Sequence, residues 1–217
     1  MSITVLLADD HAVVRDGLKL LLETQGDLQV VAEATDGRQA VRRVAHLCPR
    51  VAILDISMPE LNGIEATRQI KEASPKTQVI ILSMHSSSEY IFQALRAGAR
   101  GYLLKEAAGI EVIQAVRAVN SGKRYLSQKI TDLVVDEYLR HGEAAAGDSP
   151  LERLAPRERE VLQLVAEGKS TSQIAQILPL SPKTVETYRS RLMKKLGLKD
   201  LPGLIKFALQ HGLSQVE

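Results

Sequence analysis

Short apolar runs alternate with longer amphipathic segments over the first 120 residues of the chain. The runs are apolar almost throughout rather than at every second position, which is typical of strands buried on both faces of a parallel sheet. Between the runs, apolar residues recur at helical spacing. Strands and helices in alternation predict an α/β fold, a doubly wound five-stranded parallel sheet with helices on both faces. We expect the strands at Ile3–Ala8, Leu28–Glu33, Val51–Leu54, Val79–Leu82 and Gly101–Leu104.

The pattern changes near residue 122, and from residue 150 onward every segment is helical. The segment from Ser127 to Arg140 predicts one helix, and the Gly, Ala and Pro residues of 141–150 predict a flexible hinge. Four helices are expected beyond it, at Arg157–Glu167, Ser172–Leu178, 182–196 and Leu204–Gln210. The chain is therefore expected to consist of a domain over 1–122, a linker with a helix over 123–149 and a small all-α domain over 150–217.

The residues that directly follow the strands carry the candidate chemistry. The first strand is followed by Asp9 and Asp10, the third by Asp55, the fourth by Ser83 and the fifth by Lys105. Ligands of an open parallel sheet bind beyond the carboxyl ends of its strands, so we expect these residues to meet at one rim. Crowded carboxylates repel one another, and a divalent cation with oxygen ligands relieves this, which predicts a Mg²⁺ site. A hydroxyl and a lysine suit a transferring phosphoryl group, and Asp55 is the candidate nucleophile.

These residues and their neighbours resemble the receiver domain of two-component response regulators. The resemblance covers about residues 1–120 and rests on Ala8-Asp-Asp-His11, Leu54-Asp-Ile-Ser-Met-Pro59 with Asn62-Gly63, Ser83 and Gly101-Tyr-Leu-Leu-Lys105. It implies a flavodoxin-like sheet with the strand order 2-1-3-4-5. It also implies Asp55 as the phosphoacceptor, with Ser83 and Lys105 holding the phosphoryl oxygens. The implied metal ligands are Asp10, Asp55 and the main-chain carbonyl of Ser57, with Asp9 acting through water.

The same resemblance matches Tyr102 to an aromatic residue that swings inward as Ser83 moves toward the phosphate. A tyrosine that is simply packed under the fourth helix fits the spacing about as well, so both interpretations stay open. Ser57 lies two residues after Asp55, and His85 lies two residues after Ser83. In relatives, the side chains at these two positions line the path by which water approaches the site. The remaining histidines lack metal-ligand spacing, and we interpret them as surface or packed residues: His11, His46, His141 and His211.

The composition limits the class of protein. Charged residues make up 25% and hydrophobic residues 45% of the 217 residues, as in an ordinary globular chain. No stretch approaches the roughly 20 apolar residues of a membrane helix, and no signal-peptide pattern is evident, so we expect a cytoplasmic protein. The single Cys48 excludes an internal disulfide and a cysteine-based zinc site. We expect its thiol to be packed and inert.

Positive charge is concentrated toward the C-terminal end. Residues 150–217 hold 11 Lys and Arg against 7 Asp and Glu, whereas residues 1–120 hold 13 against 14. A basic end on a near-neutral body indicates a polyanionic partner. Aromatic residues make up only 3% of the chain and Trp is absent, which is unfavourable for stacking single-stranded bases. Duplex DNA is therefore the favoured partner.

The expected helices at 172–178 and 182–196, joined by a short turn, predict a helix-turn-helix whose last member enters the major groove. The basic residues of that last helix are Lys183, Arg189, Arg191, Lys194 and Lys195, against the single acidic Glu186. A helix with one basic face is, by itself, more often a solvated surface. The turn, the preceding scaffold helix and the charge asymmetry favour a DNA-reading helix.

This region resembles the LuxR-type four-helix DNA-binding domain over about residues 150–213. The resemblance rests on Leu154-Ala-Pro-Arg-Glu-Arg-Glu-Val-Leu162, Ile174-Ala175, Ser181, Thr184-Val185 and Lys195-Leu-Gly197. It implies that Glu186, Thr187 and Ser190 face base edges and that Thr184 belongs to the same DNA-binding surface. It implies mostly phosphate contacts for Lys183, Tyr188, Arg191, Lys194 and Lys195. In relatives the fourth helix dimerises, through residues that match Leu204, Ile205, Phe207 and Ala208.

A receiver followed by a LuxR-type reader is the architecture of NarL/FixJ-type response regulators. We therefore expect a transcription factor without substrate turnover, in which a sensor histidine kinase phosphorylates Asp55 and the modified chain dimerises or binds duplex DNA, with no membrane partner. Two alternatives stay open. An aspartyl-phosphate phosphatase uses similar groups, but its Asp-x-Asp motif after the first strand is absent. A regulator that never uses phosphate would bind DNA constitutively or after another signal.

Overall fold

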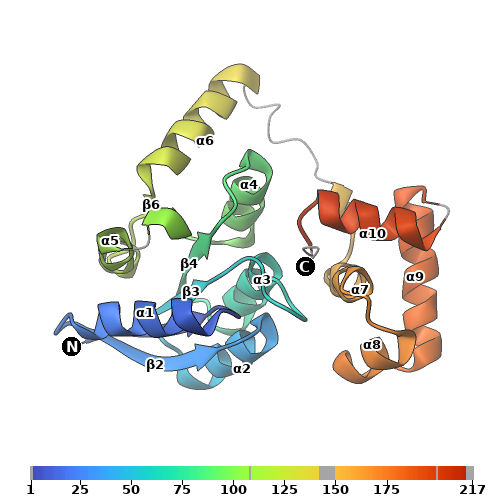
Figure 1. Ribbon diagram of the computed structural model, residues 1–217, viewed down its shortest axis with the longest axis horizontal. Coiled ribbons are helices and arrows are strands. Elements are labelled where there is room, and N and C mark those ends of the chain that lie inside the picture. The colour runs from blue at the N-terminus through green and yellow to red at the C-terminus, as the bar shows by residue number, and fades with distance from the viewer. Residues whose placement is uncertain (1, 108, 142–149, 199, 214–217) are drawn as a thin grey trace. The chain divides into compact units, whose positions relative to one another are not determined.

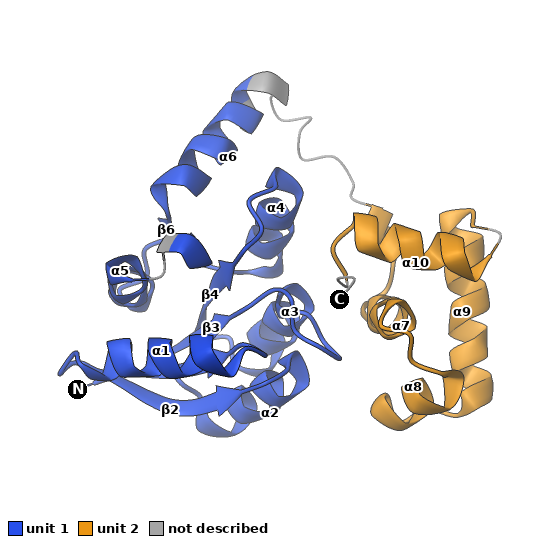
Figure 2. Ribbon diagram, in the orientation of Figure 1, with its two compact units in different colours: residues 1–146 blue, residues 147–217 orange. Residues whose placement is uncertain are grey.

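The chain forms two compact units. The structure is a computed structural model that describes residues 2–107, 109–141, 150–198 and 200–213. The units comprise residues 1–146 and 147–217 (Figure 2). Each unit has a hydrophobic core of its own. Among the helices described, none combines the length and the apolar character that a membrane crossing requires.

The first unit is built on a parallel sheet whose strands alternate with helices along the chain (Figure 1). The strands run in the order β2-β1-β3-β4-β5-β6, which confirms the predicted order of the first five. Their bounds are β1 Ile3–Ala8, β2 Leu28–Ala34, β3 Val51–Leu54, β4 Gln78–Ser83, β5 Gly101–Leu104 and β6 Tyr125–Leu126. The expected number of five strands was wrong by one. β6 has only two residues, too few to leave a readable pattern of apolar positions.

Helices cover both faces of the sheet, as the doubly wound prediction requires. Successive strand residues point to opposite faces, which divides the interior into two clusters. On one face, Leu18 and Leu22 of α1 and Val112 and Val116 of α5 pack with Leu7 and other strand residues. Residues of α2, α3 and α4 pack on the other face. The bounds are α1 Ala12–Glu23, α2 Gly37–Leu47, α3 Gly63–Ala73, α4 Ser88–Ala97 and α5 Ile110–Asn120.

The start of α3 is fixed directly behind the end of β3. The Asn62 side chain accepts a hydrogen bond from the main-chain N–H of Glu65, 2.9 Å away, and so caps the helix. A Cβ atom on Gly63 would lie 2.0 Å from the main-chain oxygen of Asp55. Only glycine therefore permits this close approach, and the helix in turn fixes the main chain at Asp55.

The segment after α5 belongs to the first unit. β6 extends the sheet at β5, and α6 (Gln128–His141) packs against α4, with Ile130 completely buried. The division between the two units falls after residue 146. The expected hinge over 141–150 lies, from 142 to 149, outside the described residues.

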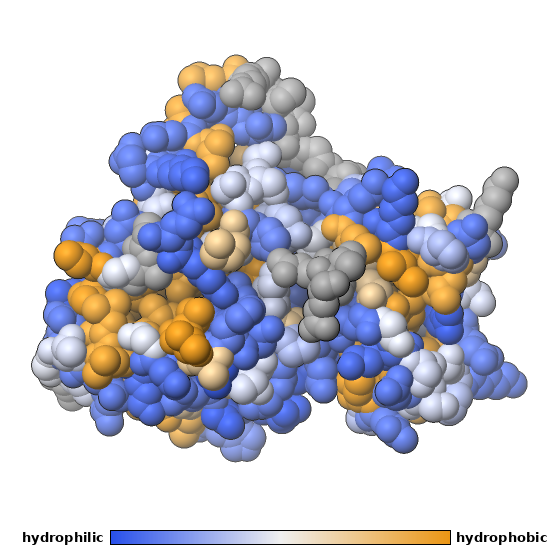
Figure 3. Space-filling model, viewed as in Figure 1, coloured by the Kyte–Doolittle hydropathy of each residue, from blue (hydrophilic) through white to orange (hydrophobic). Residues whose placement is uncertain are grey.

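Cys48 corrects one expectation. It is exposed rather than packed, at the C-terminal end of α2, where its φ of 44° is left-handed. The apolar run before it belongs to a helix whose buried face is formed by Ala40 and Val44, and the helix ends before Cys48 can join that face. Other apolar side chains are also exposed on this unit. They include Val13, Leu20 and Ile110, and Figure 3 shows apolar residues over the face that carries α1 and α5.

Every element described in the second unit is a helix, as predicted. Its elements are η3 Pro150–Arg153, α7 Pro156–Ala166, α8 Thr171–Ile177, α9 Pro182–Leu196 and α10 Leu201–Gln210. The core is formed by residues such as Leu162, Ile174, Val185 and Leu192. α10 begins at Leu201, three residues earlier than expected. Asp200 caps it by accepting a hydrogen bond from the N–H of Gly203 at 2.8 Å, and a proline in the first turn needs no N–H partner.

Candidate functional site

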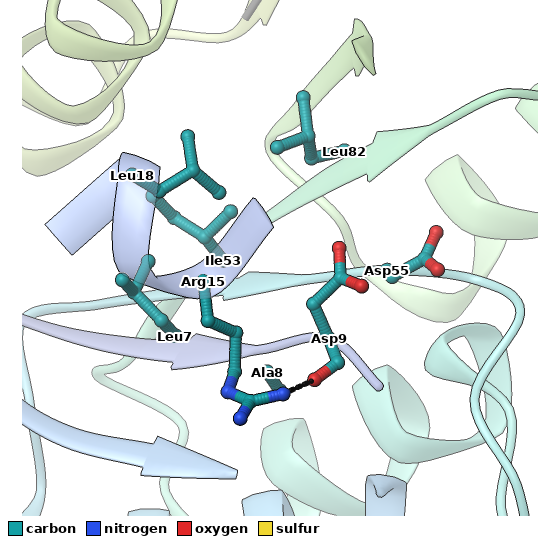
Figure 4. A pocket seen from close by; sticks show the side chains of 8 residues that line it. All are labelled: Leu7, Ala8, Asp9, Arg15, Leu18, Ile53, Asp55 and Leu82. Carbon is teal, nitrogen blue, oxygen red and sulfur yellow. Dashed lines mark hydrogen bonds between the residues drawn. The ribbon is translucent and has the colours of Figure 1, made fainter. Parts of the chain in front are cut away.

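The residues that follow β1, β3 and β5 meet the last residue of β4 at the carboxyl end of the sheet. Asp9 and Asp55 are each 3% exposed, and Ser83 is completely buried. The main-chain N–H of Asp55 donates to the carbonyl of Ala8 at 2.8 Å, which holds the ends of β1 and β3 side by side. Figure 4 shows the carboxylates of Asp9 and Asp55 close to each other at these ends. The parallel sheet thus brings together residues that lie far apart in the sequence.

Lys105 links the two buried carboxylates. Its Nζ atom lies 2.7 Å from Oδ2 of Asp9 and 2.9 Å from Oδ2 of Asp55. Burial acts to lower the pKa of Lys105, but the two carboxylates outweigh it and raise the pKa. Burial raises the pKa of Asp55, against the opposing effect of Lys105. The lysine is therefore a fixed positive charge, whereas Asp55 is a carboxylate that burial disfavours and further positive charge would stabilise.

The acidic residues form a group that could hold a metal ion. One ligand atom from each of Asp9, Asp10, His11 and Asp55 lies within 4.8 Å of all the others. Three carboxylates against the ammonium of Lys105 leave an excess of negative charge, and carboxylate oxygens are the ligands that hard divalent cations prefer. The donor set therefore fits such a cation.

His11 was missed as a member of this group. Its Nδ1 atom lies 2.7 Å from Oδ1 of Asp10, and its main-chain N–H donates to Oδ1 of Asp9 at 2.9 Å. The side chain is exposed, as expected, but it stands at the rim. The signal in the sequence was its position directly after the two aspartates, where a strand end and a helix start place it beside them.

Arg15 is a second residue at the rim that the sequence did not indicate. Its guanidinium donates to the main-chain oxygen of Asp9 at 2.7 Å (Figure 4). Arg15 lies on α1, six residues beyond Asp9, and helical geometry alone turns it back over the end of β1. It fixes the main chain that carries the first aspartate.

His85, in the loop after β4, contacts both Ser83 and Ser57. The main-chain N–H of His85 donates to Oγ of Ser83 at 3.1 Å, and its Nε2 atom lies 3.0 Å from Oγ of Ser57. The imidazole stacks on the ring of Tyr90 in α4, with centroids 4.3 Å apart. Burial lowers the pKa of His85, so the ring is neutral at neutral pH. Ser57 and His85 are therefore in contact with each other beside Asp55.

Tyr102 is completely buried, and its hydroxyl donates to the main-chain oxygen of His85 at 2.8 Å. Its ring belongs to the cluster that contains Ile91 and Ala94 of α4. Burial raises the pKa of Tyr102, so the phenol remains a protonated donor. The tyrosine is thus packed under α4 and also bonded to the loop that carries Ser83.

The second unit presents the expected basic helix. In α9, Val185 and Leu192 face the core, while Thr184, Tyr188 and Arg189 are half-buried. The exposed polar and charged residues of this helix are Lys183, Glu186, Thr187, Ser190, Arg191, Lys194 and Lys195. These include each residue proposed to read bases. The N-terminus of α9 is fixed by Ser181, whose Oγ accepts from the N–H of Thr184 at 3.1 Å, and by Pro182 in the first helical position.

Lys195 has a partner within the unit. Its Nζ atom lies 2.7 Å from Oε2 of Glu158, a buried carboxylate at the start of α7. Burial acts against the ionised form of Glu158, but Lys195 and the N–H of Ala155 outweigh it and lower the pKa of Glu158. The ion pair ties the C-terminal end of α9 to the start of α7.

Two of the four expected dimer residues are placed where they cannot meet another chain. Leu204 and Ala208 are completely buried in the core of the unit, where α10 packs on α7. Residues at i and i+4 share one face of a helix, and here that face is the inner one. Ile205 and Phe207 are only partly buried and keep some exposed surface.

Comparison with known proteins gives matches over both units. A family model described as the response regulator receiver domain matches residues 5–117, and one described as bacterial regulatory proteins of the luxR family matches residues 152–208. Oxygen regulatory protein NreC of Staphylococcus haemolyticus is 41% identical over 212 residues, which cover 96% of this chain and 98% of that protein.

Solved structures agree with these matches. The response regulator RcsB of Salmonella typhimurium is 30% identical, with a TM-score of 0.58 over 95% of this chain and 97% of that one. A structure of an RcsB–DNA complex is 29% identical, with a TM-score of 0.59 over 95% of this chain and 98% of that one. This chain belongs to the two-component response regulators of the NarL/FixJ type, a receiver domain followed by a LuxR-type DNA-binding domain.

Proposed function

We propose that Asp55 accepts a phosphoryl group from the phosphohistidine of a sensor histidine kinase, and that this modification controls how α9 binds duplex DNA. The observation that carries the proposal is the arrangement of Asp9, Asp55 and Lys105. A buried carboxylate at the end of a central strand lies 2.9 Å from a lysine that also binds a second buried carboxylate. Such a site can accept a phosphoryl group and neutralise its charge.

The transfer needs positioning and charge neutralisation more than covalent chemistry. The bond between phosphorus and the histidine nitrogen of the kinase breaks as a bond forms between phosphorus and a carboxylate oxygen of Asp55. Lys105 then pairs with a phosphoryl oxygen. The Oγ of Ser83 already accepts the N–H of His85, so its own proton can be donated to another phosphoryl oxygen.

The proposed ligands of Mg²⁺ are the carboxylates of Asp10 and Asp55 and the main-chain carbonyl of Ser57, with Asp9 acting through water. When bound, Mg²⁺ supplies positive charge that neutralises the transferring oxygens. Lys105 keeps Asp9 and Asp55 in place and offsets part of their repulsion. Arg15 holds the main chain of Asp9.

We infer that Tyr102 and Ser83 shift the receiver between two states. A ligand changes such an equilibrium only by its different affinity for the two states. Ser83 and the hydroxyl of Tyr102 are both hydrogen-bonded to the main chain of His85. A phosphoryl group that binds Ser83 therefore acts on the same loop that holds Tyr102. The loop after β4 is therefore the element through which phosphorylation of Asp55 can change the position of Tyr102.

The proposed output is DNA binding by α9. Glu186, Thr187 and Ser190 are proposed to read base edges, with Thr184 on the same DNA-binding surface. Lys183, Tyr188, Arg191 and Lys194 are proposed to bind phosphates, whereas Lys195 is engaged by its ion pair with Glu158. We propose that the phosphorylated chain acts as a homodimer in the cytoplasm, without turnover of a substrate. The dimer surface on α10 is then restricted to residues such as Ile205 and Phe207.

The proposal is tested by incubating the full chain with radiolabelled acetyl phosphate and Mg²⁺. We expect stoichiometric labelling of the wild type and none of the Asp55→Asn variant. Asp16→Asn, at an exposed position on α1, is the matched control and should label like the wild type. Labelling of Asp55→Asn would contradict the assignment. Continued release of phosphate from phosphoester substrates would favour a phosphatase, and DNA binding that ignores phosphodonor would favour a regulator that does not use phosphate.

A further inference from the structure

Two elements between the two family matches, β6 and α6, belong to the same compact unit as the receiver. The matched ranges end at residue 117 and resume at residue 152. Within this interval, β6 joins the edge of the sheet and α6 packs on α4 and β5. α6 is also the last element of the first unit before the chain continues to the DNA-binding unit.

β6 binds the main chain of Tyr102. Gly101 pairs with Tyr125 and Tyr102 pairs with Leu126 in a parallel register. The N–H of Ser127, directly before α6, donates to the main-chain oxygen of Tyr102 at 3.1 Å. Tyr102 is thus held at two points, with its hydroxyl on His85 and its carbonyl on Ser127.

The side chain of Tyr102 also shares its core with α6. Ile130 is completely buried in the cluster that contains Tyr102, and Leu126 and Leu133 pack against this cluster. Val135 lies on the other side of α6 and is 49% exposed. One face of α6 is therefore part of the packing around the tyrosine.

We propose that Ser127 and Ile130 are positioning residues that couple Tyr102 to α6, so that phosphorylation of Asp55 is transmitted along β6 and α6, the last elements described in the chain before the DNA-binding unit. The inference rests on the proposed function. Packed interiors have few voids, and they respond to displacement by moving between discrete arrangements. A Tyr102 ring that changes position must therefore displace Ile130, and any accompanying shift of the Tyr102 main chain moves the carbonyl that is bonded to Ser127.

Two pairs of variants of the full chain test the coupling. Ser127→Pro removes the N–H that binds Tyr102, whereas Gln128→Pro places proline at the first helical residue, where it is tolerated, and keeps that N–H. Ile130→Ala opens the core beside Tyr102, whereas Val135→Ala shortens an exposed side chain. Duplex DNA affinity is measured for each variant with and without beryllofluoride, a phosphoryl mimic.

We expect the ratio of the two affinities to fall about threefold or more in Ser127→Pro and Ile130→Ala, and to stay near the wild-type value in Gln128→Pro and Val135→Ala. Ile130→Val fills more of the core than Ile130→Ala, so its ratio of DNA affinities with and without beryllofluoride should lie close to that of the wild type. Labelling of Asp55 by acetyl phosphate is measured in parallel. If Asp55 is labelled and both test variants keep the wild-type ratio, the coupling is absent. If the wild type itself is not labelled, the proposed function fails and this inference fails with it.

A measurement on the wild type needs no folded variant. Hydrogen exchange of the Ser127 amide should change when beryllofluoride is added, because its acceptor is the carbonyl of Tyr102, and should not change in Asp55→Asn. An unchanged amide in a wild-type chain whose DNA affinity responds to beryllofluoride would overturn the inference, whatever the stability of the variants.

Discussion

The hydroxyl of Tyr102 donates to the main-chain carbonyl of His85, 2.8 Å away, and the N–H of the same His85 donates to Oγ of Ser83 at 3.1 Å. One residue of the loop after β4 therefore binds both of the residues proposed to move together. The coupling between them requires no long path, because a displacement of His85 changes both hydrogen bonds.

Removing the hydroxyl of Tyr102 should weaken the fold modestly. In Tyr102→Phe the ring still fills the core, but the carbonyl of His85 loses its donor, and we expect the free energy of unfolding to fall by about 1 kcal/mol. Urea denaturation of the full chain measures this change. Tyr125→Phe is the control, because the hydroxyl of Tyr125 meets Gln114 at an exposed site, and it should cost less. If the free energy of unfolding falls equally in both variants, the buried bond to His85 stabilises the fold no more than the exposed bond of Tyr125 does.

The alternation of strands and helices and the site at the strand ends could be predicted from local patterns in the sequence, whereas the strand order followed from the family resemblance. Continuous apolar runs mark strands buried on both faces, and the residue after each run is fixed by the geometry of a parallel sheet. Asp9, Asp55 and Lys105 could therefore be brought together before any coordinates were known. Their contacts within hydrogen-bonding distance follow from that topology.

Features that depend on contacts between distant residues could not be predicted. β6 pairs by two residues only, and its place beside Tyr102 comes from packing rather than from its own pattern. The partner of Lys195 is 37 residues away in the sequence, so the charge pattern of α9 alone does not reveal this ion pair. Leu204 was assigned from a family resemblance, whereas its burial is decided by how α10 packs on α7.

Mg²⁺ should stabilise the folded chain. A ligand that binds only the folded state adds stability in proportion to the logarithm of its concentration, about 2.7 kcal/mol at a hundred times its dissociation constant. We expect the melting temperature of the wild type to rise with added MgCl₂ and that of Asp10→Asn to rise much less. Asp16→Asn, on the surface of α1, should respond like the wild type. A wild-type response in Asp10→Asn would remove Asp10 from the ligand set.

The stability of the metal-free chain should depend on pH through Asp55. Burial raises the pKa of Asp55 above its ordinary value of 3.8, so the unfolded chain loses this proton at a lower pH than the folded chain. Stability contributed by the protonated form is therefore lost as pH rises above about 4, until the folded chain has ionised as well. Urea denaturation in EDTA should show Asp55→Asn becoming more stable than the wild type over this range.

An exposed aspartate gives the opposite sign and serves as the control for that measurement. The hydrogen bond from Arg117 lowers the pKa of Asp27, so this residue stabilises the fold once pH exceeds its ordinary value. Asp27→Asn should therefore lose a little stability relative to the wild type as pH rises. If Asp55→Asn followed the same trend as Asp27→Asn, Lys105 rather than burial would control the carboxyl of Asp55.

Two neighbouring lysines of α9 should differ in what they contribute. Lys195 pairs with the buried Glu158, so Lys195→Met should lower the free energy of unfolding by about 1 kcal/mol. Lys194 is exposed, and Lys194→Met should leave stability nearly unchanged while reducing the salt dependence of binding to a short duplex by about one unit of slope. Denaturation and binding titrations over a range of salt concentrations separate the two effects. A full unit of slope lost in Lys195→Met, with stability intact, would mean that the ion pair opens and Lys195 binds a phosphate.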